Sequence, residues 1–170
     1  DGIPESNEAR TTGESIEKPI IFSGKAMTIF GDSISAGVTS PNYAITQNSY
    51  INLFASKCDA ILTNKAISSS CITGGATISI YNQITTFSGV SDIIIIAGGV
   101  NDYATAKPLG DYNSVDNLTF YGALRGICEK ITTDYPGAVV IFITPIPTTK
   151  PLSGAILPLR SYSDAIYNIA

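Results

Sequence analysis

The chain has 170 residues, 44% of them hydrophobic and 14% charged, so it is long enough for one domain with a core and too apolar to be disordered. Its formal net charge of −4 argues against a nucleic-acid-binding protein, which needs a clustered basic face. The longest apolar run, Ile93–Ala97, is far too short to cross a bilayer, and three cysteines without any histidine exclude the common metal-site spacings. We therefore expect no membrane span and no metal site of a common type.

The first 20 residues differ in composition from the rest of the chain. They carry five acidic and two basic side chains and are interrupted by glycine and proline, whereas the remaining body is nearly neutral. Such composition is typical of a linker or a mobile arm. We predict a polar arm over residues 1–20 and a single domain over residues 21–170.

From residue 26 onward, short apolar runs alternate with longer stretches of helical periodicity. We predict strands at 26–30, 60–63, 92–97 and 139–144, and helices at 48–58, 77–84, 118–135 and 161–170. Strands that are almost entirely apolar are typical of parallel sheets buried on both faces. The sequence thus predicts an α/β fold of three layers, with a parallel sheet between helices and its site at the carboxyl ends of the strands.

A small-residue motif, Gly31–Gly37, follows the first predicted strand with the sequence GDSISAG. A serine at such a strand-to-helix turn can expose its hydroxyl while backbone amides point toward an anion. The motif lacks the lysine of a phosphate-binding loop, so a nucleoside triphosphate site is not expected. Taken alone, Ser33 is equally typical of an ordinary turn.

A second motif, Gly99-Val100-Asn101-Asp102, follows the third predicted strand. The side-chain amide of Asn101 can donate a hydrogen bond to an oxyanion that develops during acyl transfer. Asn and Asp also stabilise turns by bonding to their own backbone, so this motif alone does not indicate catalysis.

Together, in this order and spacing, the two motifs resemble the SGNH hydrolases, the GDSL-type esterases and lipases. The first block of that family reads GDS, as Gly31-Asp32-Ser33 does, and the third reads GxND, as Gly99–Asp102 does. The second block reads N-x-x-x-S-G, and here Asn64 opens a similar stretch in which Ser69 replaces the glycine. The runs 107–110, 119–124 and 135–147 also look like a bacterial and phage branch, so the resemblance spans residues 26–170.

The resemblance implies a role for each of these positions. Ser33 would be the nucleophile, and the oxyanion hole would consist of the Ser33 and Ser69 backbone N–H groups and the Asn101 amide. Asp32, Gly99 and Asp102 would support the two turns. The family fold is a flavodoxin-like three-layer α/β/α arrangement, and its chemistry requires neither metal nor cofactor.

The chain contains no histidine, although the family takes its general base from a late DxxH block. We therefore expect the 170 residues to be the N-terminal portion of a domain truncated before that block, and to be inactive by themselves. The chain also begins at Asp1 without methionine, which fits an excised segment. Lys65 lies near the second block, but a surface lysine is the ordinary interpretation.

The leading hypothesis is a serine esterase that hydrolyses a short-chain O-acyl ester, such as acetyl, on a carbohydrate or lipid. The alternatives are an inactive SGNH-fold module that binds carbohydrate or a surface, and a flavodoxin-like ligand-binding domain. Nucleic acid is not an expected partner, and no membrane span is expected. A cell-surface, secreted or phage-tail setting is a guess, and the oligomeric state stays open.

Overall fold

The computed structural model describes residues 21–40, 42–147 and 156–170. The arm predicted over residues 1–20 lies outside the described residues, as does most of the proline-containing stretch at 148–158. Within the described part of the chain, no helix has the length and apolarity that crossing a membrane requires.

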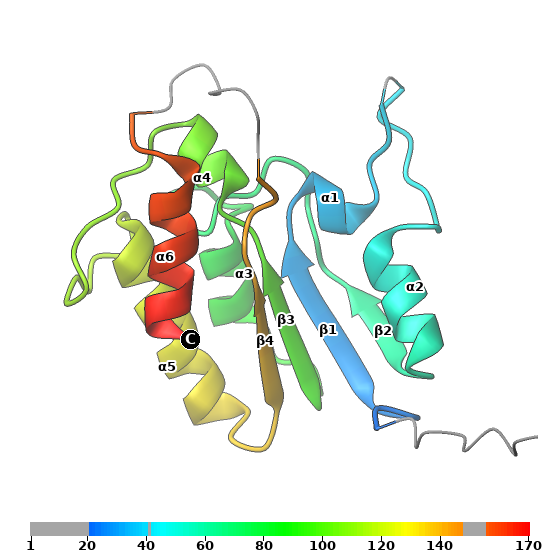
Figure 1. The fold of residues 1–170 in the computed structure, drawn as a ribbon. Coiled ribbons are helices and arrows are strands. Elements are labelled where there is room, and N and C mark those ends of the chain that lie inside the picture. Colours follow the sequence, from blue (N-terminus) through cyan, green and yellow to red (C-terminus); the bar gives the residue numbers. More distant parts are fainter. Residues whose placement is uncertain (1–20, 41, 148–155) are drawn as a thin grey trace, which may run out of the picture.

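A parallel sheet forms the centre of the fold, as the sequence predicted (Figure 1). Its strands are β1 (Ala26–Gly31), β2 (Ile61–Asn64), β3 (Ile93–Ala97) and β4 (Val139–Ile143), in the order β2-β1-β3-β4. All three strand pairs are parallel, and Met27 of β1 lies opposite Ile93 of β3. Every residue of β3 is buried, because this strand has a neighbour on each side and covered faces.

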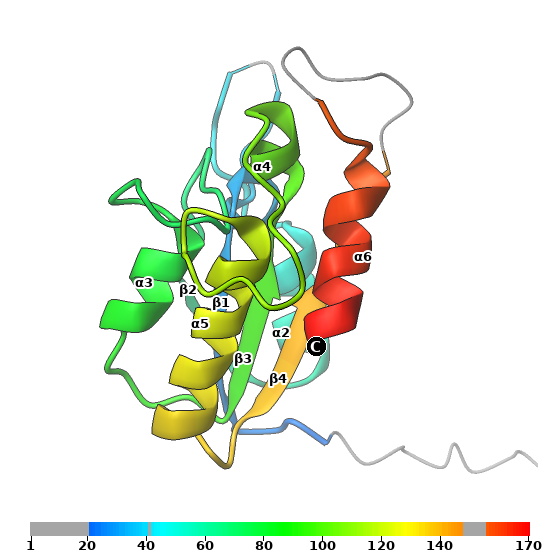
Figure 2. The same cartoon turned by 90° about the vertical axis from the view of Figure 1, so that its left-hand side faces the viewer.

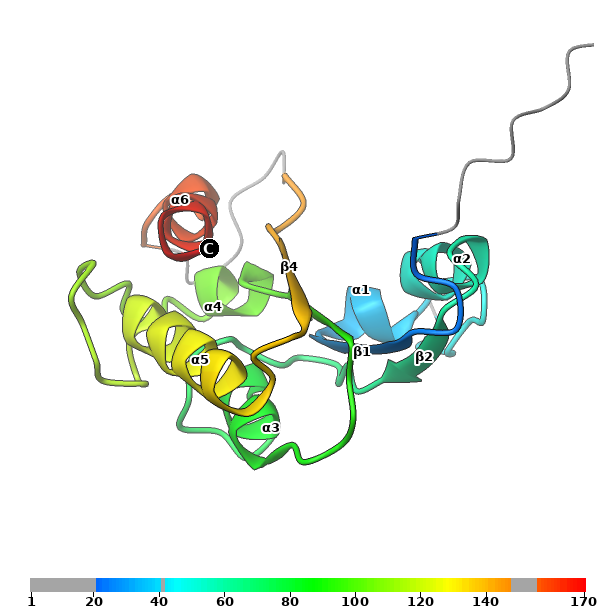
Figure 3. The ribbon, with the colours of Figure 1, turned by 90° about the horizontal axis from the view of Figure 1, so that it is seen from below.

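Helices cover both faces of the sheet, which confirms the three-layer prediction (Figure 3). The helices are α1 (Ser33–Ala36), α2 (Tyr50–Lys57), α3 (Ile80–Thr86), α4 (Val100–Ala104), α5 (Phe120–Asp134) and α6 (Leu159–Ile169). Helices α1 and α2 lie on one face, and α3 and α5 lie on the opposite face. Helix α6 packs against α5 and α4 (Figure 2).

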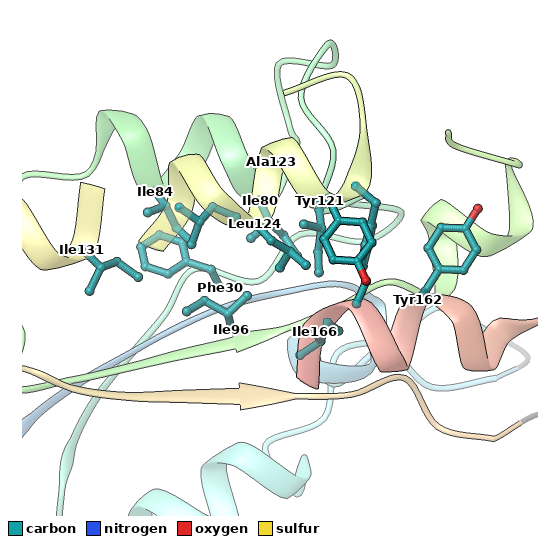
Figure 4. Close-up of a cluster of buried hydrophobic side chains, with 14 of the residues drawn as sticks. Phe30, Ile80, Ile84, Ile96, Tyr121, Ala123, Leu124, Ile131, Tyr162 and Ile166 are labelled. Atoms are coloured by element: carbon teal, nitrogen blue, oxygen red, sulfur yellow. The ribbon is translucent and has the colours of Figure 1, made fainter. Parts of the chain in front are cut away.

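The larger hydrophobic core lies between the sheet and helices α3, α5 and α6 (Figure 4). Phe30 and Ile96 contribute from the strands, and Leu124 from α5. The ring of Tyr162 in α6 packs edge-on against Phe120 with centroids 5.0 Å apart, and its hydroxyl donates to the Lys107 carbonyl at 2.6 Å. Helix α6 is therefore anchored both to α5 and to the segment that follows α4.

A smaller core lies under α2. The fully buried side chains of α2 are Ile51 and Ala55, whereas Tyr50 and Phe54 of the same helix are partly exposed. The sheet beneath this helix presents Met27, Ile29 and Ile95, and the compact residues of α2 fit against them. The larger aromatic side chains remain partly exposed beside the helix.

Candidate active site

The predicted site residues lie at the carboxyl ends of β1, β2 and β3. Ser33 follows β1 and Asn101 follows β3, and these strands are neighbours in the sheet. The chain leaves β1 toward β2 on one side and enters β3 on the other, so the strand order reverses at this point. Open α/β sheets bind their ligands at such a reversal.

The turn that carries Ser33 is defined by the residues on either side of it. The Asp32 carboxylate caps α1 by accepting the Ile34 N–H at 2.9 Å. A Cβ on Gly31 would lie 2.5 Å from the Ser35 Oγ and 3.1 Å from the Ala97 carbonyl oxygen, so only glycine allows α1 to approach this closely. Ser33 itself is partly exposed, at the first position of the helix.

Asn101 lies in the first turn of α4, a five-residue helix that the sequence analysis did not predict. Gly99 is the N-cap of this helix, and its φ of 110° falls in a region that side chains disfavour. Among the residues that the structure describes, the Asn101 Nδ2 donates to one acceptor, the Ser70 carbonyl, at 2.9 Å. A primary amide has two donor hydrogens, so a second is available to a ligand.

Asp102 fastens the loop after β2 to α4. This side chain has 0% exposure, and its two carboxylate oxygens accept the N–H groups of Ile72 and Thr73 at 2.7 and 3.0 Å. Together with the Asn101 bond to Ser70, these hydrogen bonds join α4, which carries the third sequence block, to the loop that carries the second. The Asp102 carboxylate thus connects α4 to the part of the loop that follows Ser69.

Ser69 has a φ of 65°, in the left-handed region that favours glycine. The second-block pattern named above has glycine at this position, and here a serine adopts a backbone conformation that glycine favours. Among the described residues, no hydrogen-bond acceptor contacts the Ser69 N–H. The N–H is therefore free to donate to a bound group.

The site contains two buried carboxyl groups, Asp32 and Asp102, whose pKa values are both raised. Burial raises the pKa of Asp32, while the N–H groups of Ile34 and Ser35 oppose the rise and the nearby Asp102 adds to it. Burial likewise raises the pKa of Asp102, against the opposing hydrogen bonds from Thr73 and Ile72. Desolvation disfavours a carboxylate, and backbone donors compensate for it only in part.

Two side chains that hold α1 in place, Ser35 and Tyr50, were not indicated by the sequence. Ser35 is 1% exposed, and its hydroxyl shares a 2.8 Å hydrogen bond with the Tyr50 hydroxyl of α2. The Ser35 carbonyl accepts the Asn64 Nδ2 at 2.9 Å. The second-block pattern pointed to Asn64, but no sequence signal indicated its partner.

An apolar cleft of about 560 Å³ lies next to this turn, between α1 and the end of β4. Asp32 and Ile34, the neighbours of Ser33, line it on one side, and Ile143 and Pro145 line it on the other. The cleft offers space beside the predicted nucleophile. Within the described residues, no cluster of three potential ligands could hold a metal ion, and all three cysteines are unpaired.

The fold and the positions of these residues define a protein of the SGNH-hydrolase class, a three-layer α/β/α domain with its sequence blocks at one end of the sheet. The sequence model of the GDSL-like lipase/acylhydrolase family matches residues 29–170. The chain belongs to that family.

Solved structures share the fold of this chain. A protein from Lactobacillus plantarum is 28% identical, with a TM-score of 0.74 over 86% of this chain and 72% of that one. A Bacteroides ovatus protein named as a GDSL-like lipase is 21% identical, with a TM-score of 0.64 over 86% and 80%. A family two carbohydrate esterase from Clostridium thermocellum, solved in complex with cellohexaose, is 21% identical, with a TM-score of 0.55 over 86% and 50%. A search of curated proteins gave no match.

Proposed function

We propose that this chain supplies the nucleophile and the oxyanion hole of a serine esterase, which hydrolyses a short-chain O-acyl ester on a carbohydrate or lipid. The observation that carries the proposal is the contact between two sequence blocks. Asn101, after β3, donates to the Ser70 carbonyl, and this bond holds one candidate donor beside another, the N–H of Ser69. Family membership supports hydrolase chemistry, and the cellohexaose complex of the Clostridium thermocellum esterase favours a carbohydrate acceptor.

The proposed reaction begins when the Ser33 Oγ attacks the ester carbonyl carbon and a base takes the hydroxyl proton. The carbonyl oxygen becomes an oxyanion, which accepts hydrogen bonds from the N–H groups of Ser33 and Ser69 and from the Asn101 amide. The bond to the alcohol oxygen then breaks, the alcohol leaves with the proton, and an acyl group remains on Ser33. Water hydrolyses this acyl-enzyme by the same steps. One oxyanion donor contributes about 3 kcal/mol to lowering such a barrier.

A base is indispensable to this proposal, because a serine hydroxyl is a weak nucleophile until its proton is removed. The 170 residues contain no histidine, so an imidazole that serves Ser33 would have to come from outside them. Asp32 is not assigned this role, because its carboxylate already caps α1.

The test is active-site labelling of the protein as its natural source produces it. We expect a fluorophosphonate to add once, on Ser33, and the same preparation to release acetate from an acetylated cello-oligosaccharide. Ser33→Ala should abolish both signals, whereas Ser88→Ala, which alters an exposed serine before the start of β3, should preserve them. The isolated 170-residue chain should remain unlabelled because it has no imidazole.

A natural protein that neither forms the adduct nor releases acetate would overturn the esterase proposal. Binding of unmodified cello-oligosaccharide by that inactive protein would instead support the alternative, a carbohydrate-binding module with an SGNH fold.

A further inference from the structure

The helix that carries Ser33 is too short to maintain its own position. Helix α1 spans four residues, Ser33–Ala36, and an isolated turn of helix has too few hydrogen bonds to be stable. The Asp32 cap orders its beginning, but a cap within the same turn cannot set where the helix lies relative to the rest of the site. Contacts with other elements must do so.

Asn64 makes such a contact at each end of its side-chain amide. Its Nδ2 donates to the Ser35 carbonyl at 2.9 Å, two residues after the nucleophile. Its Oδ1 accepts the Ala66 N–H at 3.0 Å, in the loop that leads to Ser69. One amide group therefore bridges the helix that carries Ser33 and the loop that carries a second oxyanion donor.

The loop that follows Asn64 is hydrogen-bonded to β1, so the Asn64 side chain extends from a segment that the sheet holds in place. The Lys65 N–H donates to the Ile29 carbonyl at 2.8 Å, and the Ile67 N–H donates to the Gly31 carbonyl at 3.0 Å. The loop thus runs beside the end of β1 up to Gly31, the residue at which the nucleophile turn begins. Among the described residues, the side-chain hydrogen bond that joins this part of the chain to α1 is the one from the Asn64 amide to the Ser35 carbonyl.

From these contacts we infer that Asn64 is a positioning residue, which sets the place of the Ser33 helix relative to the Ser69 N–H. The effect of Asn64 on catalysis rests on the esterase function proposed above. A displacement of about 1 Å between reacting groups costs on the order of 100-fold in rate. Loss of the Asn64 donor is therefore expected to lower kcat by roughly 10- to 100-fold and to leave KM nearly unchanged.

The substitution Asn64→Asp separates this role from that of a turn residue. The carboxylate keeps the acceptor for the Ala66 N–H, but it replaces the donor to Ser35 with an oxygen. Asn64→Ala, which is neutral, controls for the added charge. Because Asn64 is exposed, neither variant opens a cavity in the core. Asn82→Asp is the matched control, since the Nδ2 of Asn82, in α3, makes a similar 2.8 Å bond to the Ala76 carbonyl in the loop before that helix.

Two measurements decide the inference. Hydrogen exchange of the 170-residue chain should show faster exchange at the Ala36, Gly37 and Val38 amides, which close the turn of α1, in both Asn64 variants and not in Asn82→Asp. In the natural protein, kcat should fall in the Asn64 variants alone.

Unchanged exchange at α1 would overturn the inference, as would faster exchange with kcat intact. A natural wild-type protein without turnover would instead refute the proposed function. The exchange measurement would still decide whether Asn64 holds the Ser33 helix.

Discussion

Ser69 provides a quantitative test of the site geometry, because a serine occupies a backbone conformation that suits glycine. A non-glycine residue in the left-handed region costs about 1–2 kcal/mol. Glycine lacks that strain but loses about 0.5–1 kcal/mol through the greater freedom of its unfolded state. With φ at 65°, we expect Ser69→Gly to raise the free energy of unfolding by about 0.5–1 kcal/mol, which corresponds to a Tm increase of roughly 1–4 °C.

The matched control is Ser68→Gly, one residue earlier in the same loop. Ser68 is exposed like Ser69 but does not have a positive φ, so glycine there should lower the free energy of unfolding by about 0.4–1 kcal/mol. Urea denaturation followed by circular dichroism measures both variants against the wild type. The reasoning fails if Ser69→Gly is destabilised as much as Ser68→Gly, because the backbone at Ser69 would then not be strained.

Three further predictions concern the elements around the site. Gly31→Ala should lower the free energy of unfolding by about 1–3 kcal/mol, because the added Cβ would overlap the Ser35 side chain. Gly137→Ala is the control and should have little effect, because a Cβ there would have no atom within 4 Å. Equal urea midpoints for the two variants would contradict this prediction. Leu124→Ala should cost about 2–5 kcal/mol in thermal or urea unfolding, because Leu124 is fully buried in the larger core, and a loss below 1 kcal/mol would show that the core is loosely packed there. Burial raises the pKa of Asp102, so its contribution to stability is present below the ordinary value of 3.8 and is lost as pH rises through the raised value. The urea midpoint of the wild type, measured relative to that of Asp102→Asn, should therefore fall as pH rises from 3.8 through the raised pKa. A relative midpoint that stays constant or increases with pH would refute the raised pKa of Asp102.

The strands were predictable because their signal is local and strong. The run Ile93–Ala97 is apolar throughout and bounded by polar or small residues, so it is recognisable without any knowledge of its neighbours. Helix α5 was equally evident from the spacing of Leu124, Ile127 and Ile131, all of which are buried. Helix α4 was missed because its five residues are too few to show a helical period, and its start depends on the conformation of Gly99.

The chemistry of the site was predictable only in outline. The motifs identified Ser33 and Asn101 as candidates, since they follow strands that a parallel sheet brings to one edge. The contacts that orient them were not predictable. The Asn64 bond to Ser35 joins residues 29 positions apart, and the Tyr50 bond to Ser35 joins residues 15 apart. Such pairs leave no periodic pattern in the sequence and emerge only from the packing of α1 against its surroundings.

The parallel pairing of β1 with β3 has a consequence for how the protein is made. The backbone N–H of Ala26 bonds to the Asp92 side chain at the start of these strands, and the two residues are 66 positions apart. A ribosome adds about 5–20 residues per second, so β1 emerges roughly 3–13 s before its central partner exists. During that interval the apolar segment from Met27 to Phe30 has no strand to pair with on that side. Until β3 emerges, only pairing with β2 or binding by chaperones can keep this segment from aggregating. Slower translation between β1 and β3 should therefore increase aggregation of the nascent chain.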